Sequence, residues 1–443
     1  MGKKNQDKIA VSKIGRAGKL ANTGAKIGGN YMKYYAKKLV NKSIDRDELD
    51  EANAKDAFSA FSELKGGPLK MAQMLSLGDQ LLPKAYTMQF AQAQNQVTPL
   101  SYPLIQKTFK NAVGSSTDEI FDHFSKQAVN AASIGQVHKG RIGNEDYAVK
   151  IQYPGVADSL LSDMAMITPF ATRMFNMNKD QIAPYLKEVK SKLLEETDYK
   201  QEIENANHII EGCAGLSNLC FPKFKPELSG DRVITMSWIE GLGLADWIKT
   251  APSQEERNLI GQSLWDFYHH QIHEMHFMHA DPHPGNFIIT PENKLGVIDF
   301  GCIKSFPEDF YQSYLQLISH GQQPNPKTFI LALIDLGMFD PNAPENERIL
   351  VLNTFKEMFS LVGKPLWQER FDFGDDAFFK TIYTQGEALS KNPDLQRLST
   401  RGSEHFIYFN RTYFGLYQLL NQLKAEVNTK WVGGTVAPLK KSA

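Results

Sequence analysis

The sequence has few of the features that mark secreted, membrane-spanning or metal-rich proteins. Its 443 residues include three cysteines, Cys213, Cys220 and Cys302, whose spacing forms neither a disulfide framework nor a CxxC zinc pair. No run of about 18 apolar residues occurs, so no membrane-spanning helix is expected. The basic N-terminus lacks the apolar stretch of a secretory signal. We therefore expect a soluble cytoplasmic protein with one large domain or two to three ordinary ones.

Acidic residues are almost missing from the start of the chain. Residues 1–42 carry eleven Lys or Arg and one acid, Asp7, in a chain whose formal net charge is -1. Tyrosines and aliphatic residues are interspersed, a pattern typical of segments that lie on an anionic membrane or bind nucleic acid. We expect peripheral association with the inner face of a membrane and no nucleic acid. The alternative is a mobile, solvated tail.

Changes of pattern divide the remainder into three parts. A helical extension over 43–115 is followed by a strand-rich part over 116–241 and a mostly helical part over 242–443. Within them we expect two strands around a turn over 130–152, a long polar helix over about 180–212, a buried strand over 232–241 and a hairpin over 286–300. The fold class predicted is α+β.

Six of the eleven histidines lie between His269 and His283, which raises the question of a metal site. A helical zinc site needs H-E-x-x-H, with histidines four apart and a catalytic glutamate after the first. His269 and His273 have this spacing, but His270 stands where the glutamate should be. We expect most of these histidines to make packing and polar contacts on one helix.

A different chemistry fits the same stretch. Asp281 follows His279 by two positions, Asn286 follows Asp281 by five, and Asp299-Phe300-Gly301 ends the hairpin. Protein kinases use H-R-D-x-x-x-x-N and D-F-G at these places. Asp281 would orient or deprotonate the attacking hydroxyl or water, whereas Asn286 and Asp299 would bind Mg²⁺.

Kinases also need a lysine on a strand for the nucleotide phosphates. Tyr147-Ala148-Val149-Lys150 matches V-A-I-K on an expected strand, so Lys150 is the candidate. The glycine-rich phosphate loop that should precede it is missing. Alanines stand there instead, and the loop residues expected to contact ATP are Ala131, Ala132, Ser133, Ile134, Gly135, Gln136 and Val137.

The segments NAASIGQVH, YAVKIQYPGV, EETDYKQEIENA, HADPHPGN and VIDFG, in this order, resemble the UbiB-type atypical kinases over about residues 60–305. The resemblance implies a protein-kinase-like two-lobe fold, with a helical N-terminal extension packed over the active site. It implies ATP and Mg²⁺ as cofactors and a role in isoprenoid quinone or lipid metabolism. Quinone or lipid intermediates are then the expected partners beside ATP.

Several further roles follow from the resemblance. The K-x-G-Q motif of the family appears as Lys70 to Gln73 with Ala72 in place of glycine, and E-x-D as Glu196 to Asp198. Lys70 would pair with Glu196 and Asp198 and regulate access to the site. Glu202 would pair with Lys150, and residues 236–240, from Met236 to Glu240, would be the hinge beside the adenine.

We interpret the chain as a Mg²⁺- and ATP-dependent atypical kinase or ATPase that is not a general protein kinase. Two alternatives stay open. One is a small-molecule phosphotransferase of the aminoglycoside or choline kinase type. The other is a non-catalytic, nucleotide-responsive membrane adaptor.

Overall fold

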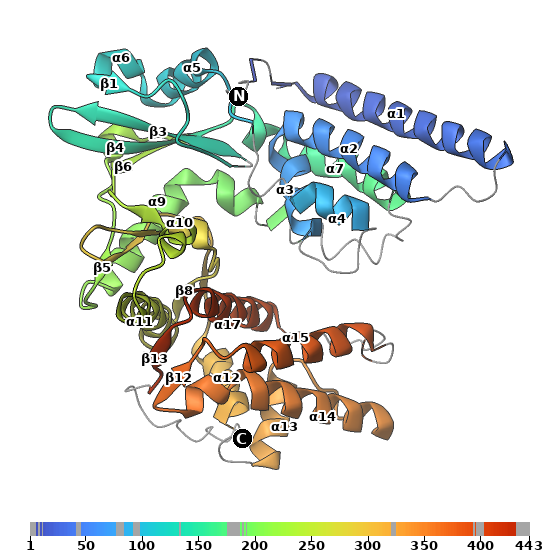
Figure 1. Cartoon of the computed structure of the whole chain (residues 1–443), viewed down its shortest axis with the longest axis vertical. Helices are drawn as coiled ribbons and strands as arrows, with labels where there is room; N and C mark the ends of the chain where they lie inside the picture. The colour runs from blue at the N-terminus through green and yellow to red at the C-terminus, as the bar shows by residue number, and fades with distance from the viewer. Residues whose placement is uncertain are drawn as a thin grey trace. The chain divides into compact units, whose positions relative to one another are not determined.

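The computed structural model describes residues 6–7, 9–10, 12–40, 46–76, 84–91, 98–132, 134–174, 187, 190–191, 193–319, 325–392, 395 and 403–430. Ser133 and the side chain of Gln73 lie outside what is described. The chain forms two compact units, one of Met1–Glu204 with Lys223–Trp238 and one of Asn205–Pro222 with Ile239–Ala443 (Figure 1). The α+β class is confirmed, with a helical N-terminal region before the first sheet.

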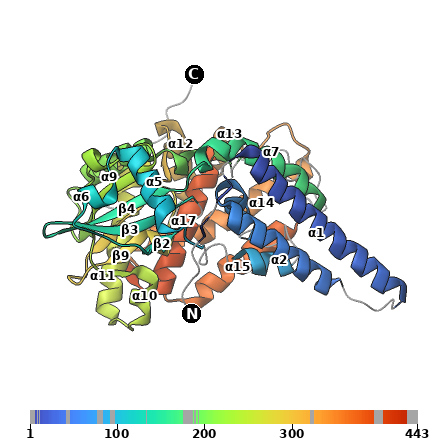
Figure 2. The same cartoon turned by 90° about the horizontal axis from the view of Figure 1, so that it is seen from above.

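Helices open the first unit. They are α1 (Lys13–Val40), α2 (Asp47–Leu64), α3 (Gly66–Ser76), α4 (Lys84–Ala91), α5 (Tyr102–Val113), α6 (Thr117–Ile120) and, after the first strands, α7 (Val156–Met174). The long helix α1 packs along α2 and against α7 (Figure 2). The corner between α2 and α3 needs glycine, because Gly66 has φ +58° and a Cβ there would lie 2.9 Å from Val156 Cγ1.

A five-stranded antiparallel sheet forms the rest of this unit. Its strands are β1 (His123–Phe124), β2 (Asn130–Ala131), β3 (Gly135–Ile142), β4 (Glu145–Gln152) and β6 (Val233–Ser237), in the order β1-β3-β4-β6 with β2 paired to β3. The two-residue turn at Gly143 and Asn144 joins β3 to β4, and Gly143 has φ +58°, as such turns require. The register places Lys150 between Val137 and Ile234.

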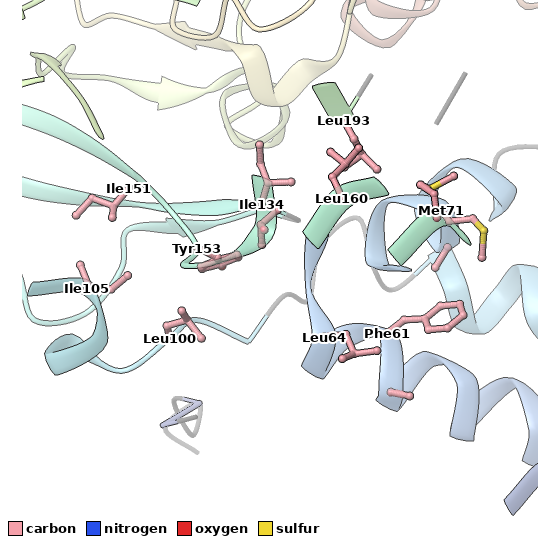
Figure 3. Close-up of a cluster of buried hydrophobic side chains, with 14 of the residues drawn as sticks. Phe61, Leu64, Met71, Leu100, Ile105, Ile134, Ile151, Tyr153, Leu160 and Leu193 are labelled. Carbon is pink, nitrogen blue, oxygen red and sulfur yellow. The ribbon is translucent and has the colours of Figure 1, made fainter. Parts of the chain in front are cut away.

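The helices and the sheet share one hydrophobic core. Figure 3 shows Phe61 and Met71 of the helices at one end of the cluster and Ile151 of β4 at the other, with Leu64 and Ile134 between them. Leu160 of α7 and Leu193 lie between these groups. The N-terminal extension is therefore part of the first unit's core and not a separately packed attachment.

The second unit is mostly helical around small sheets. Its helices are α10 (Leu244–Lys249), α11 (Gln254–His270), α12 (Glu308–Ser319), α13 (Pro326–Asp335), α14 (Glu345–Val362), α15 (Asp376–Lys391) and α17 (Glu404–Leu423), with short turns η3 (Gln271–Met275), η4 (Pro284–Asn286) and η5 (Lys364–Trp367). Helix α9 (Tyr199–Gly212) and turn η2 (Pro226–Leu228) lie near the unit boundaries in the chain.

The strands of this unit form three sheets. One has the order β5-β10-β9-β7, from β5 (Leu219–Cys220), β7 (Leu242–Gly243), β9 (Phe287–Ile289) and β10 (Leu295–Val297). The other two pair β8 (Phe277–His279) with β11 (Ile303–Ser305) and β12 (Arg370–Asp372) with β13 (Glu426–Asn428). The hairpin expected over 286–300 is present as the antiparallel pair β9 and β10.

Three expectations need correction. The helix expected over 180–212 is interrupted at Asp198, which precedes α9 and whose Oδ1 accepts a hydrogen bond from Gln201 N at 3.0 Å. Residues 13–40 are not a mobile tail, because α1 is packed and its Arg16 is fully buried. The helix that carries the first histidines ends at His276, whose φ of +50° is left-handed, and not at Pro282.

Candidate active site

Lys150 and Glu202 form an ion pair in the first unit. Lys150 lies on β4, and its Nζ is 2.7 Å from Glu202 Oε1 and 3.0 Å from Oε2. The Glu202 side chain is 4% exposed and that of Lys150 18%. A buried carboxylate needs such a partner, and the pairing holds the amine in one place on the sheet. The strand assignment and the expected pair are both present.

The alanine-rich loop is a tight turn between β2 and β3. Ala132 N donates to Gly135 O at 2.8 Å, and Tyr153 N donates to Ile134 O at 2.8 Å. A Cβ on Gly135 would lie 2.7 Å from Ile151 O, so this position requires glycine for close approach to β4. Val137 stands opposite Lys150 and shares its face of the sheet.

The side chain of Gln136, one of the loop residues expected to contact ATP, is bonded within the first unit. It pairs with Ile151 on the face of the sheet opposite to Lys150, and it is buried. Its Oε1 accepts from Leu100 N at 2.7 Å, and its Nε2 donates to Leu100 O at 3.3 Å. The side chain therefore pins the segment before α5 to the sheet. Backbone contact with a nucleotide stays a prediction for this residue.

Asp281 and Asn286 are joined in the second unit. Asn286 Nδ2 donates to Asp281 O at 2.9 Å and to Asp281 Oδ2 at 3.2 Å. Two oxygen acceptors require that the amide nitrogen faces Asp281, so the amide oxygen is directed elsewhere. Turn η4, between Pro284 and Asn286, is closed by Gly285 N donating to His283 Nδ1 at 3.0 Å.

The hairpin brings Asp299 to the same end as Asn286. The last strand pair is Phe287 with Val297, and Ile298 N donates to Asn286 O at 3.1 Å. Asp299 follows directly, and its Oδ1 accepts from Gly301 N at 3.0 Å. Asn286, which follows Asp281 by five positions, and the turn Asp299-Phe300-Gly301 thus lie at the same end of one hairpin.

His279 links the two aspartates. Its ring is buried, and Nε2 lies 2.8 Å from Asp299 O while Nδ1 lies 3.4 Å from Asp281 N. Because the first partner is an acceptor and the second a donor, the proton belongs on Nε2. His279 therefore holds the catalytic loop against the Asp-Phe-Gly segment.

The side chains at this end of the hairpin suit Mg²⁺, which needs few protein ligands, better than a metal that is bound by protein side chains alone. Mg²⁺ prefers oxygen ligands and is commonly held by one or two protein groups together with substrate phosphates and water. Asp299 offers a carboxylate and Asn286 an amide oxygen. Among the described residues, no cluster of three or more His, Cys, Asp or Glu side chains has metal-binding geometry.

Lys70 pairs with Glu196 in the first unit. Lys70 Nζ contacts Glu196 Oε1, with side chains 18% and 24% exposed. Lys70 lies on α3 and Glu196 in the helical residues 193–197, so the pair ties the extension to the chain just before Asp198 and α9. Asp198 itself lines a hollow of about 400 Å³ with Thr197, Lys200 and Arg232.

The expected hinge coincides with a boundary between the units. Met236 is buried on β6, opposite Ala148, in the first unit. The boundary falls between Trp238 and Ile239, so Glu240 belongs to the second unit. A role for Met236 and Glu240 beside the adenine stays a prediction. Lys150 and Glu202 likewise belong to the first unit, and Asp281, Asn286 and Asp299 to the second.

The remaining histidines have structural partners on several elements and not on one helix. His269 on α11 lies with Nδ1 3.1 Å from His273 Nε2, and His273 Nδ1 lies 2.7 Å from the Tyr311 hydroxyl. His276 pairs with Glu308 at 3.2 Å. His273 belongs to a turn of π-helix, a rare form that often occurs beside functional segments.

One residue beside Asp281 was not identified from the sequence. Arg411 on α17 places Nη2 3.5 Å from Asp281 Oδ1. It lies 130 positions along the chain, in a helix whose sequence offers no kinase motif, so no local signal marks it. The contact depends on how α17 packs, which the spacing of motifs does not reveal.

The first unit holds a lysine on an antiparallel sheet that pairs with a glutamate on a helix. The second, mostly helical unit holds an aspartate–asparagine loop and an Asp-Phe-Gly turn. These features define the protein-kinase-like class. A family model described as the ABC1 atypical kinase-like domain matches residues 92–330, and the chain belongs to this family. The resemblance to UbiB-type kinases is thereby confirmed.

Curated relatives come from several eukaryotes. The chain is 26% identical to the probable serine/threonine-protein kinase abkA of Dictyostelium discoideum, over 95% of this chain and 78% of that protein. It is 27% identical to the mitochondrial atypical kinase COQ8B of Danio rerio, over 88% and 62%. It is 28% identical to the mitochondrial atypical kinase COQ8 of Saccharomyces cerevisiae, over 65% and 58%.

A solved structure supports the fold. The complex of Rv3197 with erythromycin, from Mycobacterium tuberculosis, superposes with a TM-score of 0.58 at 22% identity, covering 92% of this chain and 96% of that one. The arrangement of helices and strands is therefore similar over nearly the whole length of both proteins.

Proposed function

We propose that the chain is a Mg²⁺- and ATP-dependent atypical kinase or ATPase. The observation that carries the proposal is the meeting of Asp281, Asn286 and Asp299 at one end of the β9–β10 hairpin. Asn286 and Asp299 would hold Mg²⁺, which neutralises phosphate charge when bound. Asp281 would orient the attacking oxygen, and Lys150, held by Glu202, would contact the phosphates.

The acceptor is proposed to be water or a small lipid-linked hydroxyl. Lys70 and Glu196 support this, because their ion pair anchors an extension helix of a kind that peptide-phosphorylating kinases do not need. By analogy with UbiB-type kinases, the process served is isoprenoid quinone or lipid metabolism.

The outer face of α1 supports a place at a membrane surface. Ile14 and Leu39 are each 87% exposed there, and Met32 and Tyr35 are exposed beside basic residues. Apolar side chains among lysines are typical of helices that lie in the plane of an anionic bilayer. No helix in the described part of the chain is long and apolar enough to cross one.

The small-molecule phosphotransferase alternative is not favoured. Membership in the ABC1 atypical kinase-like family, whose model matches residues 92–330, accounts for the alanine-rich loop, which an aminoglycoside or choline kinase does not predict. A nucleotide-responsive adaptor without catalysis would use Asn286 and Asp299 for Mg²⁺ but would not need Asp281, which would orient the attacking oxygen.

Replacement of Asp299 by asparagine tests the proposal. The variant removes the negative charge of the carboxylate that would bind Mg²⁺. Asparagine has nearly the same size as aspartate, and its amide oxygen can still accept the hydrogen bond from Gly301 N. We expect MgATP to raise the melting temperature of the parent but not of Asp299→Asn. Asp246→Asn, at an exposed carboxylate of the same unit, serves as the matched control. Equal stabilisation of Asp299→Asn and the parent would contradict the site.

The acceptor is tested separately by measuring ADP release. Turnover is measured for the protein alone, for the protein with anionic liposomes, and for the protein with liposomes that carry isoprenoid quinone precursors. Release in all three conditions indicates hydrolysis, and a labelled lipid product indicates transfer. Absence of ADP release under every condition, with MgATP bound, would favour the adaptor.

A further inference from the structure

Helix α17 presents one face to the catalytic loop of the second unit. Tyr408, Arg411 and Gly415 lie at i, i+3 and i+7, which places them on the same side of a helix. The Lys304 ammonium of β11 is 4.6 Å from the Tyr408 ring centroid. A Cβ on Gly415 would lie 2.2 Å from Pro282 Cγ, so helix and loop are in close contact here.

Arg411 lies on α17 between Tyr408 and Gly415, and its guanidinium contacts the Asp281 carboxylate. The Asp281 carboxylate is approached from two sides, because Oδ2 accepts from Asn286 Nδ2 at 3.2 Å and Oδ1 is 3.5 Å from Arg411 Nη2. The two side chains of the pair are 34% and 39% exposed. Ion pairs this exposed contribute little to stability. Their contact orients Asp281 more than it stabilises the fold.

The catalytic loop contributes no fixed positive charge of its own. Residues 279–286 read His-Ala-Asp-Pro-His-Pro-Gly-Asn, without Lys or Arg. Phosphoryl transfer spreads negative charge over the transferring group, and enzymes oppose it with positioned cations, arginine among them. Arg411 brings a guanidinium to the Asp281 side of this loop.

We propose that Arg411 is a positioning residue for phosphoryl transfer, an inference that rests on the proposed function. It holds the Asp281 carboxylate toward the attacking water or hydroxyl. The attacking oxygen bonds to the γ-phosphorus as the bond to the β,γ-bridging oxygen breaks, and ADP leaves with that electron pair. The proton of the nucleophile passes to Asp281 and then to solvent. Gly415 permits the helix to stand close enough for this contact.

The first test compares Arg411→Ala with Arg411→Lys. We expect kcat to fall about 100-fold in Arg411→Ala, the loss typical of a misplaced catalytic group. Binding of MgADP and the melting temperature should stay as in the parent. Arg411→Lys should recover part of kcat, and guanidinium ion at non-denaturing concentration should rescue Arg411→Ala. Lys430→Ala, which breaks the ion pair with Glu369, is the control that neither loses kcat nor responds to guanidinium.

The second test changes the helix without touching the arginine. Gly415→Ala forces Pro282 away from α17 and should lower kcat with MgADP binding retained. Gly386→Ala on α15 is the matched control, because nothing lies within 4 Å of its added Cβ. It should leave kcat unchanged.

The outcomes separate this inference from the proposed function. Asp281→Asn should lower kcat at least as much as Arg411→Ala, and the double variant should be no worse than Asp281→Asn alone, because Arg411 acts through that carboxylate. If Asp281→Asn and Asp299→Asn lose turnover while Arg411→Ala keeps it, the role of Arg411 is wrong and the function stands. If Arg411→Ala and Arg411→Lys both lose nucleotide binding together with turnover, the residue only supports packing. If Asp281→Asn and Asp299→Asn keep full turnover, the proposed function itself fails.

Discussion

Arg16 is a fully buried arginine whose five N–H groups all find acceptors. Nε and Nη2 each donate to the Asp163 carboxylate at 2.6 Å, and the other donors reach the carbonyls of Ala10, Leu64 and Lys65. Breaking such a buried pair by removing one partner costs about 3–5 kcal/mol, because the other charge stays in the interior. The residue therefore fastens α1 to the corner where α3 begins.

Buried histidines should make the stability of the second unit depend on pH. Burial, with the neighbouring His276 adding to it, lowers the pKa of His273 from 6.5 to about 3. The unfolded chain then binds a proton between about pH 6.5 and 3 that the folded chain does not, so stability falls as pH falls through this window.

We expect this histidine to contribute a loss of about 2 kcal/mol in the free energy of unfolding between pH 7 and pH 5. Urea unfolding of the parent and His273→Gln at both pH values measures it, and the variant should show the smaller difference. His208→Gln, at an exposed position of the same unit, should behave as the parent. Equal pH dependence in His273→Gln and the parent would refute the assignment.

Among the elements, α1 differs in character between its two faces. Leu20, Ile27 and Tyr34 are buried against the neighbouring helices, whereas the opposite face exposes lysines and apolar side chains. Deleting the helix would therefore remove part of the core as well as any membrane contact. Substitutions on the exposed face separate the two effects.

Replacement of Lys26, Lys33 and Lys37 by glutamine should weaken sedimentation with cardiolipin or phosphatidylglycerol vesicles. Each basic residue near an anionic surface contributes about 1 kcal/mol, so the triple variant should bind roughly 100-fold less tightly. Raised salt should reduce binding of the parent in the same way. Lys107, Lys110 and Lys126, exposed away from α1, provide the control triple. Similar binding of both triples would exclude α1 as the contact.

The sequence predicts local elements of the site better than their surroundings. Asp281, Asn286 and Asp299 follow from spacing within one loop and one hairpin, where chain connectivity limits the geometry. The pairing of Lys150 with Glu202, which are 52 positions apart, was expected only from the resemblance to the UbiB-type kinases. Contacts between distant segments carry no such signal. Gln136 was assigned to the nucleotide because its motif is local, yet its partner is Leu100. The sequence also did not predict the π-helical turn before His276 or the contact of Arg411 with Asp281.

At the scale of the whole molecule, the extension and the first sheet cannot be separated. Leu100, Ile105 and Phe109 belong to the same core as Ile134 and Ile151. Each large apolar side chain fully buried contributes about 1.5–3 kcal/mol, and a domain is stable by only about 5–15 kcal/mol.

A chain that begins at residue 116 should therefore fail to form a stable first unit. We expect it to lose near-ultraviolet circular dichroism and to bind a hydrophobic dye strongly, as partly folded proteins do. The full chain measured alongside is the reference. A truncated chain with native-like spectra and cooperative unfolding would show that the sheet has a sufficient core of its own.

The Arg16–Asp163 pair also has a consequence for how the protein is made. The two residues are separated by 147 positions. At a synthesis rate of about 5–20 residues per second, the aspartate is polymerised roughly 7 to 30 seconds after the arginine. During that interval the buried charge of the nascent α1 lacks its carboxylate partner, so α1 cannot settle into its final packing before Asp163 has been made. The first unit is expected to complete its folding only once α7 has emerged, and a chaperone that shields basic amphipathic helices would act in that interval.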